Sequence, residues 1–397
     1  MALNDYKKAF DNAYQEVFQK TLVAKEVMNT RFESVLKFGA SVERVAIDIS
    51  NVQVRDVVRG NASIIDPVND TSELLTINLE KETAFYLSDG ELTQTGPLNP
   101  AQEYGKQTAR KLALDLDGRC FAEVRNALHG FDTGDLTTSV SNNVPITLNG
   151  TTVPQMASRM GSKLRNRNNQ EINTNMILIT DSYAAGSITE FIISKNIDLA
   201  GAAFKNGYSG DVSNARMYVS ENLQGEATFV STGVFADNET VTINGVVFTA
   251  KTALSAVPGQ FLIGGTAAIS ITNLTALINA PTVTTANGIA LISSSDLEII
   301  SKIRATATSA TVLTLVGTGT GRMFLTDTAA NFSFVTNFIY SYFGKKGAID
   351  LVIQDMKEVD MRITSDRRGV NIFNSYLAGV RTYADGARKF LAVKIAV

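Results

Sequence analysis

The sequence predicts an α+β fold, and three observations indicate it. Two alternating segments, 42–54 and 75–87, have the period of paired β-strands. A helical pattern then continues unbroken from Pro100 for about eight turns. The composition changes sharply over residues 226–322, which indicates a module inserted into another domain. At 397 residues the chain exceeds a usual single-core domain, so we expect about two or three core units.

The first element expected is an amphipathic helix over residues 3–22. Its apolar side chains that fall close to one face are Leu3, Tyr6, Phe10, Val17 and Phe18. Asp5, Asp11 and Glu16 argue against the strongly basic opposite face of a membrane-surface helix. We therefore expect an arm or a helix that flanks a core.

Residues 42–87 are expected to form one long hairpin with its tip at 66–70, a cluster of turn-forming residues. The apolar positions along its two strands are Val45, Ile47, Ile49, Val52, Val54, Leu75, Ile77, Leu79, Phe85 and Leu87. A two-stranded hairpin is only marginally stable alone in water, so this hairpin needs another surface to lie on. A neighbouring copy of the same chain is the surface that we expect.

The long helix is expected to begin with Asn99 as its N-cap and Pro100 in its first turn. The buried stripe predicted by the i, i+4 spacing is Leu112, Leu116, Cys120, Val124 and Leu128. Gly105 and Gly118 lie inside the helix, where each is less favourable than alanine by about 1 kcal/mol. We therefore expect another element to pack closely against these two glycines.

Residues 130–180 are loop-rich and end in a short buried strand at 176–180. A helix is expected over 181–196, a turn at 207–210 and a strand at 216–220. These short elements predict a mixed domain that follows the long helix.

The segment 226–322 is dominated by Thr, Ala, Ser and Val. Its nine charged residues are Glu226, Asp237, Glu239, Lys251, Asp296, Glu298, Lys302, Arg304 and Arg322. A hairpin is predicted to turn at Asn244 and Gly245, and a short helix is predicted over 271–280. From Phe324 the chain resumes its more charged composition, so we expect a small β-rich α+β module inserted into another domain.

The last third is expected to alternate short strands and turns. The strand candidates are 348–353, 359–363, 376–380 and 390–395. Asp385 and Gly386 are expected to form the turn between the last two.

The composition restricts the class of protein. The net charge of −3 gives no whole-chain attraction to nucleic acid or to an anionic membrane. Cys120 is the single cysteine, so no disulfide can form within the chain, and its place in the helical stripe predicts a buried small apolar residue. No segment has the apolar length of a membrane span or the pattern of a signal peptide. We expect a soluble protein that folds in a cytoplasm.

Residues that could carry catalysis are scarce. His129 is the single histidine, and its position before Gly130 predicts a helix end rather than a member of a triad. One histidine and one cysteine do not make a zinc site. The segment Gly317–Gly321 lacks the third glycine of a dinucleotide loop and the Gly-Lys of a phosphate loop, so a flexible linker is expected. We expect no catalytic residue, no cofactor and no metal.

Basic residues occur in short clusters: Lys106, Arg110 and Lys111; Arg165 and Arg167; Lys345 and Lys346; Arg367 and Arg368. We expect solvated faces that form salt bridges between subunits. The alternative is an inner surface of a shell that touches phosphate groups without reading bases.

Four segments carry a resemblance in their order along the chain: 75–89, 206–223, 345–350 and 375–386. The order of an N-terminal arm, a long hairpin, a long helix, a mixed domain and a strand-rich return resembles a tailed-bacteriophage (Caudoviricetes) major capsid protein with the Hong Kong 97-like fold. The resemblance implies an N-terminal arm at 1–41, an E-loop at 42–96, a spine helix at 97–130, a P-domain at 131–180 and 355–397, an A-domain at 181–225 and 323–354, and an insertion domain at 226–322.

That resemblance implies a structural protein of the virion, assembled in the host cytoplasm into hexamers and pentamers of an icosahedral head. The head would enclose double-stranded DNA without sequence specificity, with no membrane involved. A separate scaffolding protein and a portal are implied partners, and decoration proteins are left open. The intersubunit contacts expected on the E-loop are Val52, Val54, Arg55, Arg59, Ile64, Ile65, Leu75 and Ile77. No motif identifies a Lys–Asn pair that could crosslink.

Two other functions remain open. An encapsulin-like shell around a cellular compartment would keep the fold and change the contents. An enzyme is disfavoured by the shortage of catalytic groups, and activity of a monomer that is lost in His129→Ala would support it.

Overall fold

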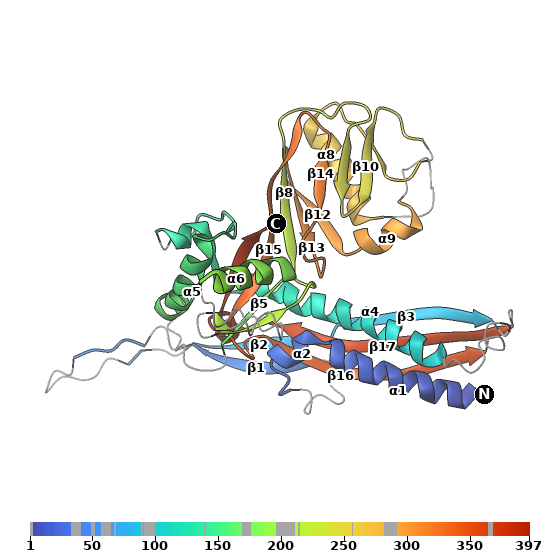
Figure 1. The fold of residues 1–397 in the computed structure, drawn as a ribbon, viewed down its shortest axis with the longest axis horizontal. Helices are drawn as coiled ribbons and strands as arrows, with labels where there is room; N and C mark the ends of the chain where they lie inside the picture. The colour runs from blue at the N-terminus through green and yellow to red at the C-terminus, as the bar shows by residue number, and fades with distance from the viewer. Residues whose placement is uncertain are drawn as a thin grey trace. The chain divides into compact units, whose positions relative to one another are not determined.

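The computed structural model describes residues 3–32, 41–48, 52–56, 65–66, 69–88, 90, 100–138, 140–168, 176–195, 211–212, 215–255, 257–281, 292–363 and 368–397 (Figure 1). The chain divides into two compact units. One consists of Met1–Ala113 and Gly347–Arg388, and the other of Leu114–Lys346 and Lys389–Val397.

The first unit is built on a three-stranded antiparallel sheet. Strand β17 (Gly369–Arg381) lies in the middle, between β16 (Asp350–Ile363) and β3 (Leu79–Ser88). The strands predicted at 348–353 and 359–363 are parts of the single strand β16, which contains register shifts. These irregularities break the alternation of side chains, so the sequence pattern looks like two short strands.

Helix α1 (Leu3–Thr21) confirms the predicted N-terminal helix and is followed by α2 (Val23–Val27). Phe10, Tyr14 and Phe18 are fully buried and lie four residues apart, so they share one face of α1. The ring of Phe10 lies 6.2 Å from that of Phe85 on β3, and the ring of Phe18 lies 6.2 Å from that of Tyr376 on β17. The apolar face of α1 therefore covers this sheet.

A two-stranded hairpin also belongs to the first unit. Strand β1 (Ser41–Asp48) pairs with β2 (Asn69–Thr76) from Ser41 opposite Thr76 to Asp48 opposite Asn69. The predicted hairpin exists, but its predicted tip at 66–70 is wrong, because the return strand already begins at Asn69. The predicted return strand is divided between β2 and β3, since β3 pairs with β17 instead.

Helix α4 (Pro100–Ala122) begins in the first unit and ends in the second. It is shorter than predicted, because the chain tightens into the 3-10 helix η1 (Glu123–Asn126). The predicted stripe is buried at Leu112, Leu116, Cys120 and Val124, whereas Leu128 beyond the helix is exposed. A Cβ atom added to Gly105 would lie 2.7 Å from the carbonyl oxygen of Phe10, which confirms the close packing expected there.

The second unit contains a nine-stranded sheet with the order β12-β13-β8-β15-β5-β7-β6, in which β18 pairs with β15 and β4 pairs with β18. Its strands are β4 (His129–Phe131), β5 (Met176–Thr180), β6 (Asp211–Val212), β7 (Ala215–Val219), β8 (Gly225–Ser231), β12 (Ile303–Ser309), β13 (Val312–Gly317), β15 (Phe332–Lys345) and β18 (Phe390–Ala396). The strands predicted at 176–180, 216–220 and 390–395 are confirmed as β5, β7 and β18.

Strand β15 organises this sheet and was not among the predicted strands. It pairs with β8 along its first part and with β18 and β5 along its second part. A register shift lies between Phe334 and Thr336, and residues 338–344 are buried without alternation. A strand buried on both faces lacks the period of two that the sequence pattern would reveal.

A second, four-stranded sheet has the order β11-β10-β9-β14. Its strands are β9 (Thr240–Ile243), β10 (Val246–Lys251), β11 (Gln260–Leu262) and β14 (Leu325–Asp327), and the helices near it are α8 (Ala267–Asn279) and α9 (Ser294–Ile300). The predicted turn at Asn244 and Gly245 is confirmed, and both have positive φ (50° and 86°). The helix predicted at 271–280 is observed as α8. A single buried cluster from Ala227 to Phe332 forms the core here.

The remaining helices among the described residues are α5 (Thr152–Asn168), α6 (Ser182–Lys195) and α10 (Ala384–Ala387). The turn predicted at Asp385 and Gly386 is the short helix α10, and the helix predicted at 181–196 is confirmed as α6. The predicted cap at Asn99 and the turn at 207–210 lie outside the described residues. Within the part of the chain that the structure describes, no helix has both the length and the apolarity to span a membrane.

Candidate interaction arm and its anchor

The arm is defined here as residues 49–68, which connect β1 to β2. In its described parts, 52–56 and 65–66, three apolar side chains are strongly exposed. Val52 is 49% exposed, Ile65 is 91% exposed and Val54 is completely exposed. Apolar side chains presented together on an extended segment indicate a surface that another molecule covers.

An ion pair joins the outgoing and returning limbs of the arm. The Arg55 guanidinium donates to Asp66 in a bidentate manner, with Nη2–Oδ1 and Nη1–Oδ2 distances of 2.6 and 2.8 Å. The backbone N–H of Gln53 donates to Asp66 Oδ2 at 2.9 Å. The hydrogen bond from Arg55 lowers the pKa of Asp66, so the pair stays ionised at neutral pH. This clasp holds Val54 and Ile65 on limbs that stay together.

The base of the hairpin is fixed by Arg44 on β1. Its Nη2 lies 2.6 Å from Asp385 Oδ2 in α10, and its Nη1 lies 3.2 Å from Asp350 Oδ2 at the start of β16. Asp350 is buried and also accepts a hydrogen bond from the Asn29 amide. The guanidinium of Arg44 lies 5.2 Å from the centre of the Tyr383 ring. One cation thus ties the hairpin to two segments that are distant in sequence, the start of β16 and residues 383–385.

Apolar packing adds to this anchor. Leu75 on β2 is buried against Val352 and Tyr383, with Phe32, Val42 and Ile77 packed around them. A Cβ atom added to Gly379 of β17 would lie 2.6 Å from the carbonyl oxygen of Thr76, so β2 passes directly over this glycine. Glu73 also accepts a hydrogen bond of 3.0 Å from the backbone N–H of Ala384. The hairpin is therefore held rigidly at its base.

The predicted contact residues divide into four groups. Val52, Val54, Arg55 and Ile65 lie on the arm and are accessible. Leu75 is fully buried in the anchor of its own chain, so it has no surface left for a neighbour and is removed from the expected contact. Ile77 is partly buried in the same cluster. Arg59 and Ile64 lie outside the described residues.

The anchor residues Arg44, Asp350 and Asp385 were not found by sequence reasoning. Asp350 and Asp385 lie 306 and 341 positions from Arg44 along the chain. A local pattern has no means of showing such a pairing, and single charged residues at strand ends carry no distinctive signal.

Two predictions about possible chemical sites need correction. His129 lies on β4, paired in parallel with Leu391 of β18, and not at a helix end. The segment Gly317–Gly321 is a packed loop and not a flexible linker. Thr318 N donates to Lys302 O and Gly321 N donates to Leu223 O, both at 2.9 Å. The reason in both cases is a long-range backbone contact that the local sequence does not show.

Cys120 is buried as predicted, and burial raises the pKa of its thiol well above the usual value, which disfavours the reactive thiolate. Among the described residues, no group of three or more His, Cys, Asp or Glu side chains could hold a metal ion.

Comparisons with known proteins gave matches only among solved structures. No family model matches the chain, and no curated protein matches it. A structure from Mycobacterium phage Che8 is 14% identical over 92% of this chain and 89% of its own, with a TM-score of 0.48. The capsid of cyanophage P-SCSP1u is 10% identical, covering 94% and 86%, with a TM-score of 0.43.

A virus-like particle from Pyrococcus furiosus is also similar, with 8% identity, 97% and 98% coverage and a TM-score of 0.42. Phage capsid proteins are the class that the sequence resembles. All three TM-scores lie below 0.5, so the function is inferred from this chain's own arm and anchor.

Proposed function

We propose that this chain is a structural subunit that associates with copies of itself into a closed shell, and that the arm lies on a neighbouring copy. The observation that carries the proposal is the exposure of Val52, Val54 and Ile65 beyond a base that is fixed in its own chain. Full burial of each such side chain contributes about 1.5–3 kcal/mol. Repeated at every subunit, this contact would stabilise the assembly.

The rigid anchor supports the same proposal. A segment that is already held in place loses less conformational freedom when it binds, so more of its contact energy remains as affinity. An arm from one copy that lies on the next makes a head-to-tail contact, and such contacts form closed rings when the rotation between copies closes. The hairpin with its anchor therefore has the properties of an assembly element.

The finer form of the proposal follows from the sequence resemblance. The subunits would form hexamers and pentamers of an icosahedral phage head around double-stranded DNA, with a separate scaffolding protein and a portal as partners. The division into N-terminal arm, E-loop, spine helix, P-domain, A-domain and insertion domain belongs to this proposal. The virion is the proposed location, and assembly takes place in the host cytoplasm.

A compartment shell in a cell is the second candidate. It would use the same arm, so the contents of the particle distinguish the two functions. Purified particles that contain double-stranded DNA, or a gene neighbourhood with portal and terminase genes, support the phage head. A protein cargo or a neighbouring gene for a cargo enzyme supports the compartment.

The proposal is tested by the triple variant Val52→Ser, Val54→Ser and Ile65→Ser. These side chains are exposed, so the isolated subunit should fold normally, while shell formation seen by negative-stain microscopy should be lost. The matched control is Val247→Ser, Val257→Ser and Val335→Ser, which changes three valines that are 48%, 53% and 60% exposed outside the arm. Normal shells from the arm variant would contradict the proposal.

A further inference from the structure

A group of buried polar atoms lies between α1 and the sheet of the first unit. The Asn374 side chain on β17 is 2% exposed, and neither its amide nitrogen nor its amide oxygen has a hydrogen-bond partner among the described residues. The hydroxyl groups of Tyr14 on α1 and Thr83 on β3 are also buried, and in the described part of the chain they have no partner either. We call Tyr14, Thr83 and Asn374 the polar seam.

The register of the sheet places two members of the polar seam side by side. Asn374 pairs directly with Thr83, so their side chains lie next to each other on one face of the sheet. Phe85 on β3 and Tyr376 on β17 each follow this pair at the next position on the same face, in opposite directions along the sheet. The polar pair therefore lies between two aromatic rings on the face that α1 covers.

Helix α1 places Tyr14 over this pair. Phe10 contacts the ring on β3 and Phe18 contacts the ring on β17, so α1 runs along the strands (Figure 1). The helix rises about 12 Å from Phe10 to Phe18, and the strands advance about 13 Å from one ring to the other. Tyr14 lies midway between Phe10 and Phe18, just as Thr83 and Asn374 lie midway between the two rings. The three polar side chains therefore converge.

Asp11 adds a buried acceptor beside the polar seam, one turn before Tyr14 on α1. Its Oδ2 accepts a hydrogen bond of 3.4 Å from the Gln15 amide, whereas its Oδ1 has no partner among the residues that the structure describes. Burial, followed by the charge of Asp11, raises the pKa of the Tyr14 hydroxyl. The hydroxyl therefore keeps its proton and is able to donate as well as to accept a hydrogen bond.

Strand β16 is irregular next to the polar seam. Its register shifts between Lys357 and Asp360, which pair with Ser375 and Phe373 on either side of Asn374. A bulge leaves its extra residue out of the ladder, so backbone donors and acceptors lie close to the Asn374 side chain. The position is therefore polar in its backbone as well as in its side chains.

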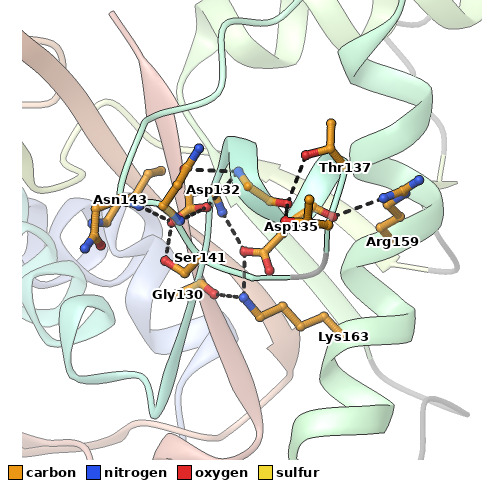
Figure 2. Close-up of polar contacts among 12 residues, drawn as sticks. Gly130, Asp132, Asp135, Thr137, Ser141, Asn143, Arg159 and Lys163 are labelled. Atoms are coloured by element: carbon orange, nitrogen blue, oxygen red, sulfur yellow. Dashed lines mark hydrogen bonds and ion pairs between the residues drawn. The ribbon is translucent and has the colours of Figure 1, made fainter.

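Asp132 in the second unit shows how a buried polar side chain is normally satisfied. Its carboxylate accepts hydrogen bonds from the backbone N–H groups of Gly134, Asn142 and Asn143 at 3.0, 3.2 and 2.9 Å, and from the Ser141 hydroxyl (Figure 2). Burial alone raises the pKa of Asp132, but these four hydrogen bonds outweigh it, so the net pKa lies below the ordinary value. Within the described residues, no such set of partners surrounds the amide of the polar seam.

From these observations we infer that the polar seam is a buried binding site for water, which bridges α1 to the sheet. A polar group that is buried without a partner costs free energy, and a bound water removes that cost. The amide nitrogen of Asn374 needs an acceptor, whereas its oxygen and Asp11 Oδ1 need donors. A metal cation accepts no hydrogen bond and a simple anion donates none, so water is the ligand that fits both needs. This site is independent of the proposed function.

The test compares single and combined substitutions that nearly keep the size of each side chain: Tyr14→Phe, Thr83→Val and Asn374→Leu. Amide hydrogen exchange in α1 reports the opening of this helix from the sheet. Asn374→Leu alone takes one partner away from the water and leaves the two hydroxyls less well satisfied, so exchange in α1 should rise by roughly tenfold. The triple variant removes all three polar groups and should return the exchange toward the wild-type rate.

A seam that binds no water predicts the opposite sign. Asn374→Leu alone would then remove an unsatisfied group, so unchanged or slower exchange in α1 overturns the inference. The matched control is Tyr86→Phe on β3, where the hydroxyl donates to the carbonyl oxygen of Arg368 at 2.6 Å. Tyr86 and Thr83 lie on opposite faces of β3, so adding Tyr86→Phe to Asn374→Leu should leave the exchange raised. Restoration by this control would also contradict a shared water.

A direct observation on the wild type covers the case in which a variant fails to fold. A density map at about 2 Å resolution or better should show a water within about 2.7–3.2 Å of the Asn374 amide. A map that resolves the side chains of the polar seam without such a water overturns the inference.

Discussion

At the scale of single residues, two glycines bring helix α4 and the loop after β13 into backbone contact. A Cβ atom added to Gly118 would lie 2.7 Å from the Cα atom of Gly319, and one added to Gly319 would lie 2.9 Å from the Cα atom of Gly118. Gly319 also has a φ of 65°, which disfavours any other residue. The close packing that the sequence suggested for Gly118 is therefore confirmed.

Gly118→Ala should destabilise the subunit by about 1–3 kcal/mol, because the added methyl group collides with backbone that cannot rotate away. The matched control is Gly186→Ala in helix α6, where nothing lies within 4 Å of the new atom. That control should gain up to about 1 kcal/mol from higher helix propensity. Urea unfolding of both variants measures the difference, and equal effects would contradict the contact.

The Asp132 carboxylate makes a prediction about pH. Its pKa is lowered in the folded chain, so its contribution to stability is complete above the unfolded pKa of about 3.9 and is lost as the pH falls through the folded value. The difference in unfolding free energy between the wild type and Asp132→Asn should stay constant from about pH 5 to 8. It should shrink below about pH 4. A difference that grows on acidification would contradict the arrangement.

At the scale of elements, the sequence predicted those that carry a distinct local signal. Helix α1 and most of α4 follow the helical period, Asn244 and Gly245 are typical turn residues, and β5 is a short run of apolar residues. The change of partner between β2 and β3 was not visible, because apolar alternation continues through Leu75, Ile77 and Leu79 while the pairing switches. Periodicity reports which face is buried and says nothing about which strand lies alongside.

The candidate site was predicted only in part for the same reason. The exposed residues of the arm follow from the expectation of a long hairpin, whereas its anchor depends on contacts that join distant segments. Arg44 meets Asp350 and Asp385 only through the tertiary fold of the first unit. The backbone N–H groups of Asn142 and Asn143 are held in a similar way by the Asp132 carboxylate, and no motif surrounds that residue.

Arg44→Ala should lower the stability of the first unit by about 2–3 kcal/mol, because it removes a partner from the buried Asp350 carboxylate. The loss is smaller than for a fully buried pair, because Arg44 itself is one-third exposed. Hydrogen exchange in β1 and β2 should rise, and assembly should weaken. Arg362→Ala is the control, since Arg362 pairs with Asp360 on the surface and such pairs contribute about 0–1 kcal/mol. Equal effects from both variants would argue against an anchor at Arg44.

At the scale of the whole molecule, the chain uses the buried carboxylate of Asp350 and the cluster around Leu75 to hold the base of an exposed arm. The arm is also the part that can be shortened without loss of either strand. A longer deletion, of residues 50–86, would also remove β2 and most of β3, so it would disturb the fold as well as the arm.

The most direct test replaces residues 49–68 with Asn-Gly. Asp48 and Asn69 are paired, so a two-residue turn closes the hairpin and leaves β1, β2 and the anchor in place. The account predicts folded subunits that form no closed shells by negative-stain microscopy, under conditions in which the wild type forms them. Closed shells of normal size from the shortened chain would contradict it.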